Sequence, residues 1–203
     1  MYKHLYENFK HWFHEGKGHV FFYSDPHFSD EKTIAFRKKK NSYISDEEQI
    51  KRINSRVGKY DTIVFLGDIG DIKPISYIKG YKVLILGNHD KGITNYRREK
   101  VTISTEDKTY IFSDNKLFDE VYEGCLTISD KIILSHEPVN FPYALNIHGH
   151  KHDLPQYYDS THINMCAEAI DYIPIPLNQI IKKGFSGIVN IHDAVRKERR
   201  SNL

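Results

Sequence analysis

Residues able to bind metal ions gather in five short clusters along this chain. The clusters are Asp25-Pro26-His27, Gly67-Asp68, Gly87-Asn88-His89-Asp90, His136 and Gly149-His150-Lys151-His152. In two clusters the donors are two residues apart, a spacing that points both side chains to the same side of an extended segment. One such pair arises often by chance. Several donor-rich clusters in a single chain favour a metal centre built from carboxylate, amide and imidazole groups.

Four apolar runs lead directly into polar, metal-binding residues. They are HVFFYS ending at Ser24, TIVFL ending at Leu66, KVLIL ending at Leu86 and KIILS ending at Ser135. Their lengths and their β-branched and aromatic residues predict strands, and their unbroken hydrophobicity predicts burial on both faces. The candidate ligands are therefore expected at the carboxyl ends of buried strands.

Helical patterns lie between and around these strands. Ser45-Asp46-Glu47-Glu48 has the form of a capping box and precedes apolar residues at helical spacing, which predicts a crossover helix ending before Gly58. Further helices are predicted before residue 19 (with Leu5, Phe9, Trp12 and Phe13 on one face), at 74–78, at 93–100, after the IPIP sequence and at 193–200. From Val101 onward, turn-separated short runs predict antiparallel sheet, so that the whole pattern indicates an α/β sandwich.

Length and composition are those of an ordinary globular protein. The chain has 203 residues, 39% of them hydrophobic, and a formal net charge of +2. We expect a single domain over 1–203, with an N-terminal extension over about 1–18, a core over about 19–182 and a C-terminal segment over about 183–203. No run approaches the roughly 20 apolar residues of a membrane span, so we expect a cytoplasmic protein without a membrane partner. Cys125 and Cys166 are expected to be reduced, buried thiols.

The order of the clusters has a counterpart in a known family. Asp-x-His, Gly-Asp, Gly-Asn-His-Asp, His and Gly-His-x-His, spread over residues 25–152, resemble the calcineurin-like metallophosphoesterase superfamily. The segment HINMCAEAIDYIPIPLNQI is similar to the closing strand and turn of its small single-domain bacterial and phage members. The resemblance implies a four-layer α/β/β/α sandwich with two divalent metal ions at the strand ends.

Seven metal ligands follow from the resemblance. Asp25, His27, Asp68 and His152 would hold the first ion, and Asp68, Asn88, His136 and His150 the second, so that Asp68 bridges the two. A carboxylate suits the bridge, because two divalent cations about 3.5–4 Å apart repel each other and need anionic oxygen between them. The donor set lacks thiolate. We expect Mn²⁺, with Fe, Zn²⁺ and Ni²⁺ as alternatives.

The resemblance also assigns catalytic and substrate-binding roles. It implies that His89 is a general acid oriented by Asp90, with a purely structural His89 as the alternative. Asn88, His89 and Arg97 are candidate substrate contacts, and loops at 28–43 and after Asp90, with their basic residues, are candidates for substrate selection. His148 either supports His150 or is ordinary packing.

The predicted function is hydrolysis of phosphate esters by attack of a metal-bridging hydroxide, with nucleotide-type phosphodiesters as the expected substrates. Phosphomonoesterase activity, including that of a phosphoprotein phosphatase, is the enzymatic alternative, and a nuclease is another. A non-catalytic binding scaffold is the alternative from a different class, disfavoured because all seven ligand positions and His89 are intact. The expected partner is a small phosphate ester. The basic runs at 37–40 and 196–200 leave nucleic acid open, and the oligomeric state is also open.

Overall fold

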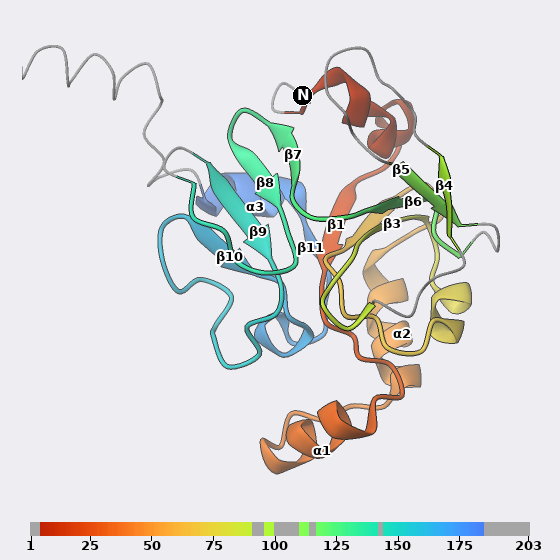
Figure 1. Ribbon diagram of the computed structural model, residues 1–203, viewed down its shortest axis with the longest axis vertical. Coiled ribbons are helices and arrows are strands. Elements are labelled where there is room, and N and C mark those ends of the chain that lie inside the picture. Colours follow the sequence, from red (N-terminus) through yellow and green to blue (C-terminus); the bar gives the residue numbers. More distant parts are fainter. Residues whose placement is uncertain (1–4, 91–95, 100–109, 114–116, 142–143, 185–203) are drawn as a thin grey trace, which may run out of the picture.

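The computed structural model describes residues 5–90, 96–99, 110–113, 117–141 and 144–184, and its strands form two sheets (Figure 1). The larger sheet has the order β11 (Ile175–Pro176), β1 (Val20–Tyr23), β2 (Thr62–Phe65), β3 (Tyr81–Ile85), β6 (Glu120–Tyr122), β5 (Tyr110–Ser113) and β4 (Tyr96–Glu99). The smaller sheet has the order β10 (His162–Asn164), β9 (Leu145–His148), β8 (Ile132–Leu134) and β7 (Leu126–Ser129).

The strands that precede the donor clusters run parallel within their sheets. β1, β2, β3 and β6 are parallel neighbours, and so are β8, β9 and β10. This arrangement corrects the prediction of antiparallel sheet after residue 101 for β8, β9 and β10, which are parallel to one another. The prediction holds for β5 with its neighbours β4 and β6, for β7 with β8, and for β11 with β1. The segments that follow β8 and β9 are long enough to cross over, so the carboxyl ends of these strands lie at one edge of the sheet.

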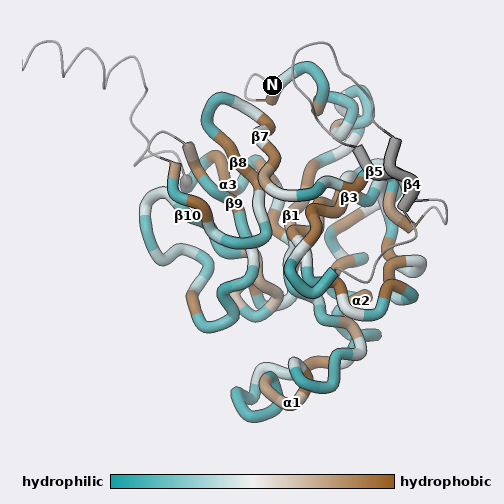
Figure 2. The backbone as a smooth tube through the Cα atoms, in the orientation of Figure 1, coloured by the Kyte–Doolittle hydropathy of each residue, from teal (hydrophilic) through white to brown (hydrophobic). Residues whose placement is uncertain are grey.

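A shared hydrophobic core lies between the sheets. All residues of β1, β2 and β9 are buried, as expected for strands covered on both faces. One cluster of buried side chains includes Phe22 and Val64 of the larger sheet together with Leu134 and Ile147 of the smaller one. Figure 2 shows the same concentration of hydrophobic residues along the central strands.

α2 (Asp46–Arg56) is the predicted crossover helix. The Ser45 side chain caps it by accepting a hydrogen bond from Glu48 N at 3.3 Å, and Ile53 is fully buried. The Tyr23 hydroxyl donates to Gln49 Oε1 at 3.0 Å, which joins the helix to β1. Figure 1 shows α2 beside the larger sheet, and with the helices flanking the two sheets the fold is the predicted α/β/β/α sandwich.

The N-terminal segment forms η1 (Glu7–Gly16) and buries Phe9, Trp12 and Phe13, as predicted. It is anchored by a buried carboxylate on β6. Glu120 accepts hydrogen bonds from Trp12 Nε1 at 3.1 Å and from the Tyr81 hydroxyl at 2.8 Å, and it also contacts His11. These contacts join the beginning of the described chain to the larger sheet.

Three other local predictions are corrected. Residues 96–99 form strand β4 rather than part of a helix at 93–100, because pairing with β5 overrides a weak local pattern. Residues 28–43 contain α1 (Glu31–Lys39) rather than only a loop, since the Asp30 side chain caps it by accepting from Lys32 N and Thr33 N. Cys166 is buried as expected, but Cys125 is exposed.

The two remaining predicted helices that the structure describes agree with expectation. η2 (Lys73–Tyr77) matches the short helix at 74–78, and β11 leads into α3 (Leu177–Gly184). η4 (Ala167–Ile170) lies between β10 and β11. The helix predicted at 193–200 lies outside the described residues. Among those that are described, no helix combines the length and the apolar character needed to cross a membrane.

Candidate metal centre

The seven candidate ligands meet where strands of both sheets end. Asp25 and His27 follow β1, and Asp68 follows β2. Backbone hydrogen bonds join these ends, because Asp25 N donates to Gly67 O at 3.0 Å and His27 N donates to Asp68 O at 3.1 Å. The other ligands follow the next strand of the larger sheet and two strands of the smaller one: Asn88 after β3, His136 after β8, and His150 and His152 after β9.

The first group of donors consists of Asp25, His27 and His152. Its ligand atoms all lie within 4.8 Å of one another. Asp25 Oδ1 is 3.5 Å from His152 Nε2 and 3.9 Å from His27 Nε2. Asp25 is fully buried, and its Oδ1 is the single buried carboxylate oxygen of the described residues that has no hydrogen-bond partner. A buried anionic oxygen without a protein hydrogen-bond partner is suited to binding a cation.

Asp68, His136 and His150 form the second group, again with ligand atoms within 4.8 Å of one another. His136 Nε2 lies 3.4 Å from Asp68 Oδ2, 2.8 Å from Asn88 Oδ1 and 3.2 Å from His150 Nδ1. The Asn88 amide oxygen therefore completes a set of four donors. Two carboxylates stabilise the protonated form of His136. Although burial opposes protonation, the contact with Asp68 and the charge of Asp25 raise the pKa of His136 to about 9.

Asp68 connects the two groups. Its Oδ2 is 3.6 Å from His27 Nε2 in the first group and 3.4 Å from His136 Nε2 in the second. Donors about 2.1 Å from one ion stand roughly 3.0–3.5 Å apart at octahedral or tetrahedral angles. Three of the six donor spacings given above lie in this range, and the other three lie close to it. The donor sets thus fit two neighbouring cations that share Asp68.

The backbone is strained at four of the seven ligands. Asp25, His27, Asp68 and His150 have φ angles of 54, 46, 55 and 67°, in the left-handed region that residues with a Cβ rarely adopt. Each such residue costs on the order of 1–3 kcal/mol and persists only where the surroundings hold it. Concentration of this strain at one site supports a functional role for the site.

Two glycines allow the strand ends to approach one another closely. A Cβ on Gly87 would stand 2.2 Å from Asp68 Oδ1, and one on Gly149 would stand 1.9 Å from Ser24 Oγ. Gly67 is also crowded, because a Cβ there would stand 2.6 Å from His136 Nδ1, and its φ of 97° is in addition a conformation that glycine adopts without steric cost. Glycine is required at positions 87 and 149 because a side chain there would collide with the neighbouring strand ends.

Three ligand histidines are oriented through the ring nitrogen that faces away from the centre. His27 Nδ1 is 3.2 Å from Asp30 Oδ2, and His136 Nδ1 is 2.7 Å from the Leu66 carbonyl oxygen. His152 Nδ1 is 3.1 and 3.2 Å from the two carboxylate oxygens of Glu168. Such contacts fix the ring and increase the basicity of the coordinating nitrogen. Sequence analysis missed Asp30 and Glu168, although the position of Asp30 three residues after His27 was a usable signal.

Arg37 belongs to the support of this centre. We expected its basic run to face substrate, but the Arg37 side chain is buried. It donates to Asp25 O at 2.7 Å, to Pro26 O at 2.8 Å and to Glu168 Oε1 at 2.6 Å. Arg37 therefore holds the loop that carries Asp25 in place and positions Glu168 against His152, with its side chain buried rather than exposed to substrate.

His89 and Asp90 differ in their surroundings. His89 is exposed, and its ring centroid lies 5.6 Å from that of His27, so a group bound at the centre can reach it. Asp90 is buried and does not act as we expected. Its oxygens accept from the backbone amides of Asp68, Ile69 and Gly87 at 2.8–2.9 Å, and burial raises its pKa. Asp90 thus fixes the turns around Asp68 rather than the ring of His89.

The structure describes the surroundings of His148 but not those of the Arg97 side chain. His148 is fully buried, with Nδ1 2.7 Å from Gly149 O and Nε2 2.8 Å from the Tyr158 hydroxyl. Its contact is with the backbone that precedes His150, and burial lowers its pKa to about 4. Arg97 lies in β4, and the position of its side chain is outside the described part of the chain.

Comparison with known proteins gave similar structures only. No family model and no curated protein matches the chain. A protein of unknown function from Aquifex aeolicus is 23% identical over 81% of this chain and 98% of its own, with a TM-score of 0.58, a likeness that shows the fold. The nuclease MPE from Pseudomonas putida is 16% identical over 66% of this chain and 61% of its own, with a TM-score of 0.41. The phosphoesterase YfcE from E. coli is 14% identical over 78% and 81%, with a TM-score of 0.35.

Proposed function

We propose that this chain is a metal-dependent phosphoesterase that prefers phosphodiesters. The observation that carries the proposal is the pair of donor groups joined by Asp68, with the exposed side chains of Asn88 and His89 beside them. Paired divalent cations at such a spacing are the usual means of stabilising both the attacking and the leaving oxygen of a phosphoryl group. The resemblance of the donor clusters to those of metallophosphoesterases supports the same reading.

The residues present can divide the work of the reaction. When bound, the two metals would supply an activated water and neutralise charge on the phosphoryl oxygens. Asp25 and Asp68 provide the buried negative charge that retains them. His89, exposed beside His27, is placed to donate a proton to the leaving oxygen, while the Asn88 amide can donate to a phosphoryl oxygen as its carbonyl oxygen faces His136.

The alternative functions place different requirements on this site. A phosphomonoesterase or phosphoprotein phosphatase would use the same centre, so only relative rates separate it from a diesterase. A binding scaffold has no need of seven intact ligands, four of them with strained backbones and three with oriented imidazole rings. The donor set of carboxylate, amide and imidazole accepts Mn²⁺ and also Fe, Zn²⁺ or Ni²⁺.

The test uses metal-depleted protein reloaded separately with Mn²⁺, Fe²⁺, Zn²⁺ or Ni²⁺. Rates on bis(4-nitrophenyl) phosphate and 4-nitrophenyl phosphate compare a diester with a monoester that has the same leaving group. We expect metal-dependent hydrolysis of both esters, with the larger kcat/KM for the diester. A larger value for the monoester would overturn the diester preference. Absence of hydrolysis with every metal, in protein that binds two equivalents, would overturn the enzymatic proposal in favour of the scaffold.

A further inference from the structure

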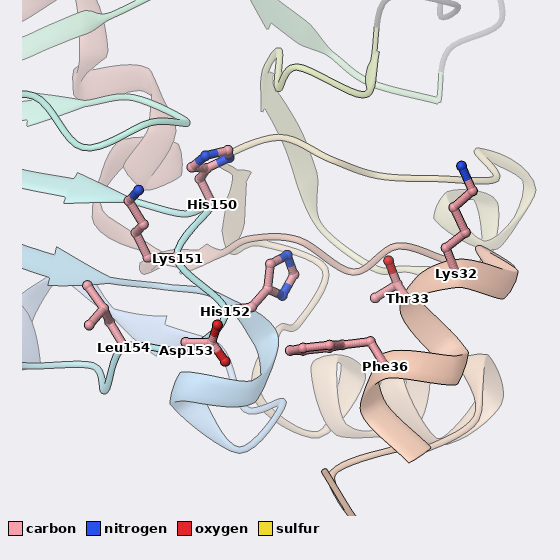
Figure 3. Close-up of a pocket in the computed structure, with 8 residues that line it drawn as sticks. All are labelled: Lys32, Thr33, Phe36, His150, Lys151, His152, Asp153 and Leu154. Carbon is pink, nitrogen blue, oxygen red and sulfur yellow. The ribbon is translucent and has the colours of Figure 1, made fainter. Parts of the chain in front are cut away.

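A cavity of about 370 Å³ opens beside the metal centre, between α1 and the segment that follows β9 (Figure 3). Two of the residues that line it, His150 and His152, are also candidate metal ligands. The opposite wall comes from α1, where Phe36 and Thr33 face His152 across the cavity. Its volume lies within the range of about 300–1,000 Å³ that is typical of small-molecule sites.

The position of the cavity indicates what would enter it. His152 presents Nε2 to Asp25, and its ring stands edge to face with that of Phe36, with centroids 6.2 Å apart. A phosphate ester whose phosphorus lies at the metal centre therefore has this cavity as an adjacent space for one of its organic groups. The lining combines apolar surface from Phe36 and Leu154 with polar side chains.

Electrostatics narrows the choice of ligand. Lys32 and Lys151 line the cavity, and neither has an ion-pair partner within the part of the chain that the structure describes. The carboxylate in the lining, Asp153, is already paired with Lys40 at 2.8 Å. Lys40 also lies 5.3 Å from the centroid of the Phe36 ring. The cavity thus offers an aromatic ring and two uncompensated ammonium groups.

We infer that this cavity binds the nucleoside part of a nucleotide-type phosphodiester, an inference that rests on the proposed phosphoesterase function. A planar base can stack on Phe36, as bases commonly do on aromatic side chains irrespective of their identity. Lys32 and Lys151 are suited to an anionic phosphate attached to the same nucleoside. A purely apolar organic group would leave the two ammonium groups unused, and a sugar phosphate would leave the ring unused.

Two esters with the same leaving group test the inference: thymidine 5′-(4-nitrophenyl phosphate) and methyl 4-nitrophenyl phosphate. In Phe36→Leu the ratio of kcat/KM for the nucleoside ester to that for the methyl ester should fall about 10-fold, because stacking on one base commonly contributes a factor of this order. Lys151→Gln should lower the affinity for thymidine 3′,5′-bisphosphate more than that for thymidine. The matched controls are Tyr77→Leu and Lys79→Gln, which alter exposed side chains on and after η2.

Binding measured by calorimetry separates this inference from the proposed function. Phe36→Leu should weaken binding of thymidine 5′-monophosphate to the protein both with and without metal, with unchanged metal content. If wild type hydrolyses neither ester but Phe36→Leu still weakens nucleotide binding, the phosphoesterase proposal fails and the binding site stands. If Phe36→Leu lowers kcat/KM equally for both esters, or leaves nucleotide binding unchanged, the inference about this cavity is overturned.

Discussion

Glu168→Gln is the change that most directly tests how this centre is built. The carboxylate of Glu168 contacts His152 Nδ1 and Arg37 Nε, on a residue that lies outside every donor cluster. Although burial opposes ionisation, His152 and Arg37 lower the pKa of Glu168 to about 2, so the side chain is ionised at any practical assay pH. Glutamine keeps the shape and one oxygen acceptor but removes the charge.

The expected effect is a loss of metal affinity of about 10–100-fold, the usual consequence of removing a partner that orients a ligand histidine. This loss corresponds to about 1.4–2.7 kcal/mol. It should fall on the group that contains His152, because Glu168 has no contact with the ligands of the second group among the described residues. Arg37 retains its bonds to two backbone carbonyl oxygens, so the fold should persist.

Metal titration by calorimetry measures the effect, with Glu31→Gln at the exposed start of α1 as the matched control. A double-mutant cycle then assigns it to one ligand. In a His152→Asn background, Glu168→Gln should cost almost nothing further, since the interaction that it breaks is already absent. Unchanged affinity in Glu168→Gln, or the same loss with and without His152, would refute the reasoning.

Four further outcomes are expected. Asp68→Ala should lower metal content more than any other single-ligand change, because Asp68 belongs to both groups; metal analysis that finds two equivalents retained contradicts this. Metal affinity in equilibrium titrations should weaken on acidification, beginning near the pKa of about 9 of His136 and continuing through about pH 6–5, since imidazole ligands must be neutral to bind; a flat profile would count against a histidine-rich site. His89→Asn should keep both metals, slow an alkyl diester by about 10²–10⁴-fold and slow a nitrophenyl diester far less; equal losses in single-turnover assays would remove its role as acid. The contact with Glu120 raises the pKa of His11. The contribution of this contact to the free energy of unfolding is therefore complete below the ordinary pKa of 6.5 and declines as pH rises through the raised pKa. His11→Gln should abolish that decline, as measured by thermal unfolding at several pH values.

The sequence predicted the positions of the strands that precede the donor clusters and the residues that these strands bring together. Each apolar run is long enough to define a strand, and each donor cluster follows its run directly, so the parallel arrangement places the clusters at one edge without further information. The direction of the strands in the smaller sheet was harder to predict. Short runs separated by turn-forming residues look alike whether the chain turns back or crosses over, and the choice depends on packing between the sheets.

The roles of residues whose partners are distant in the sequence could not be predicted from the sequence. Glu168 meets His152 and Arg37 only because η4 and α1 fold back to the same end of the sandwich, and nothing in its neighbourhood in the sequence indicates this. Arg37 looked like part of an exposed basic run for the same reason. Asp90 was misread in another way. Its adjacency to His89 suggested a partner for the ring, whereas its oxygens accept bonds from three backbone amides.

α1 shows how one element can serve the metal centre and the proposed binding cavity together. Asp30, which caps the helix, also contacts His27, and Arg37 near its end holds the loop of Asp25. Lys32 and Phe36, four residues apart and therefore on one face of the helix, line the cavity. Because both roles depend on the placement of the same short helix, a change that shifts α1 would disturb metal binding and ligand binding at once. Single substitutions on its cavity face are therefore the informative ones, since they separate recognition of the organic group from assembly of the metal centre.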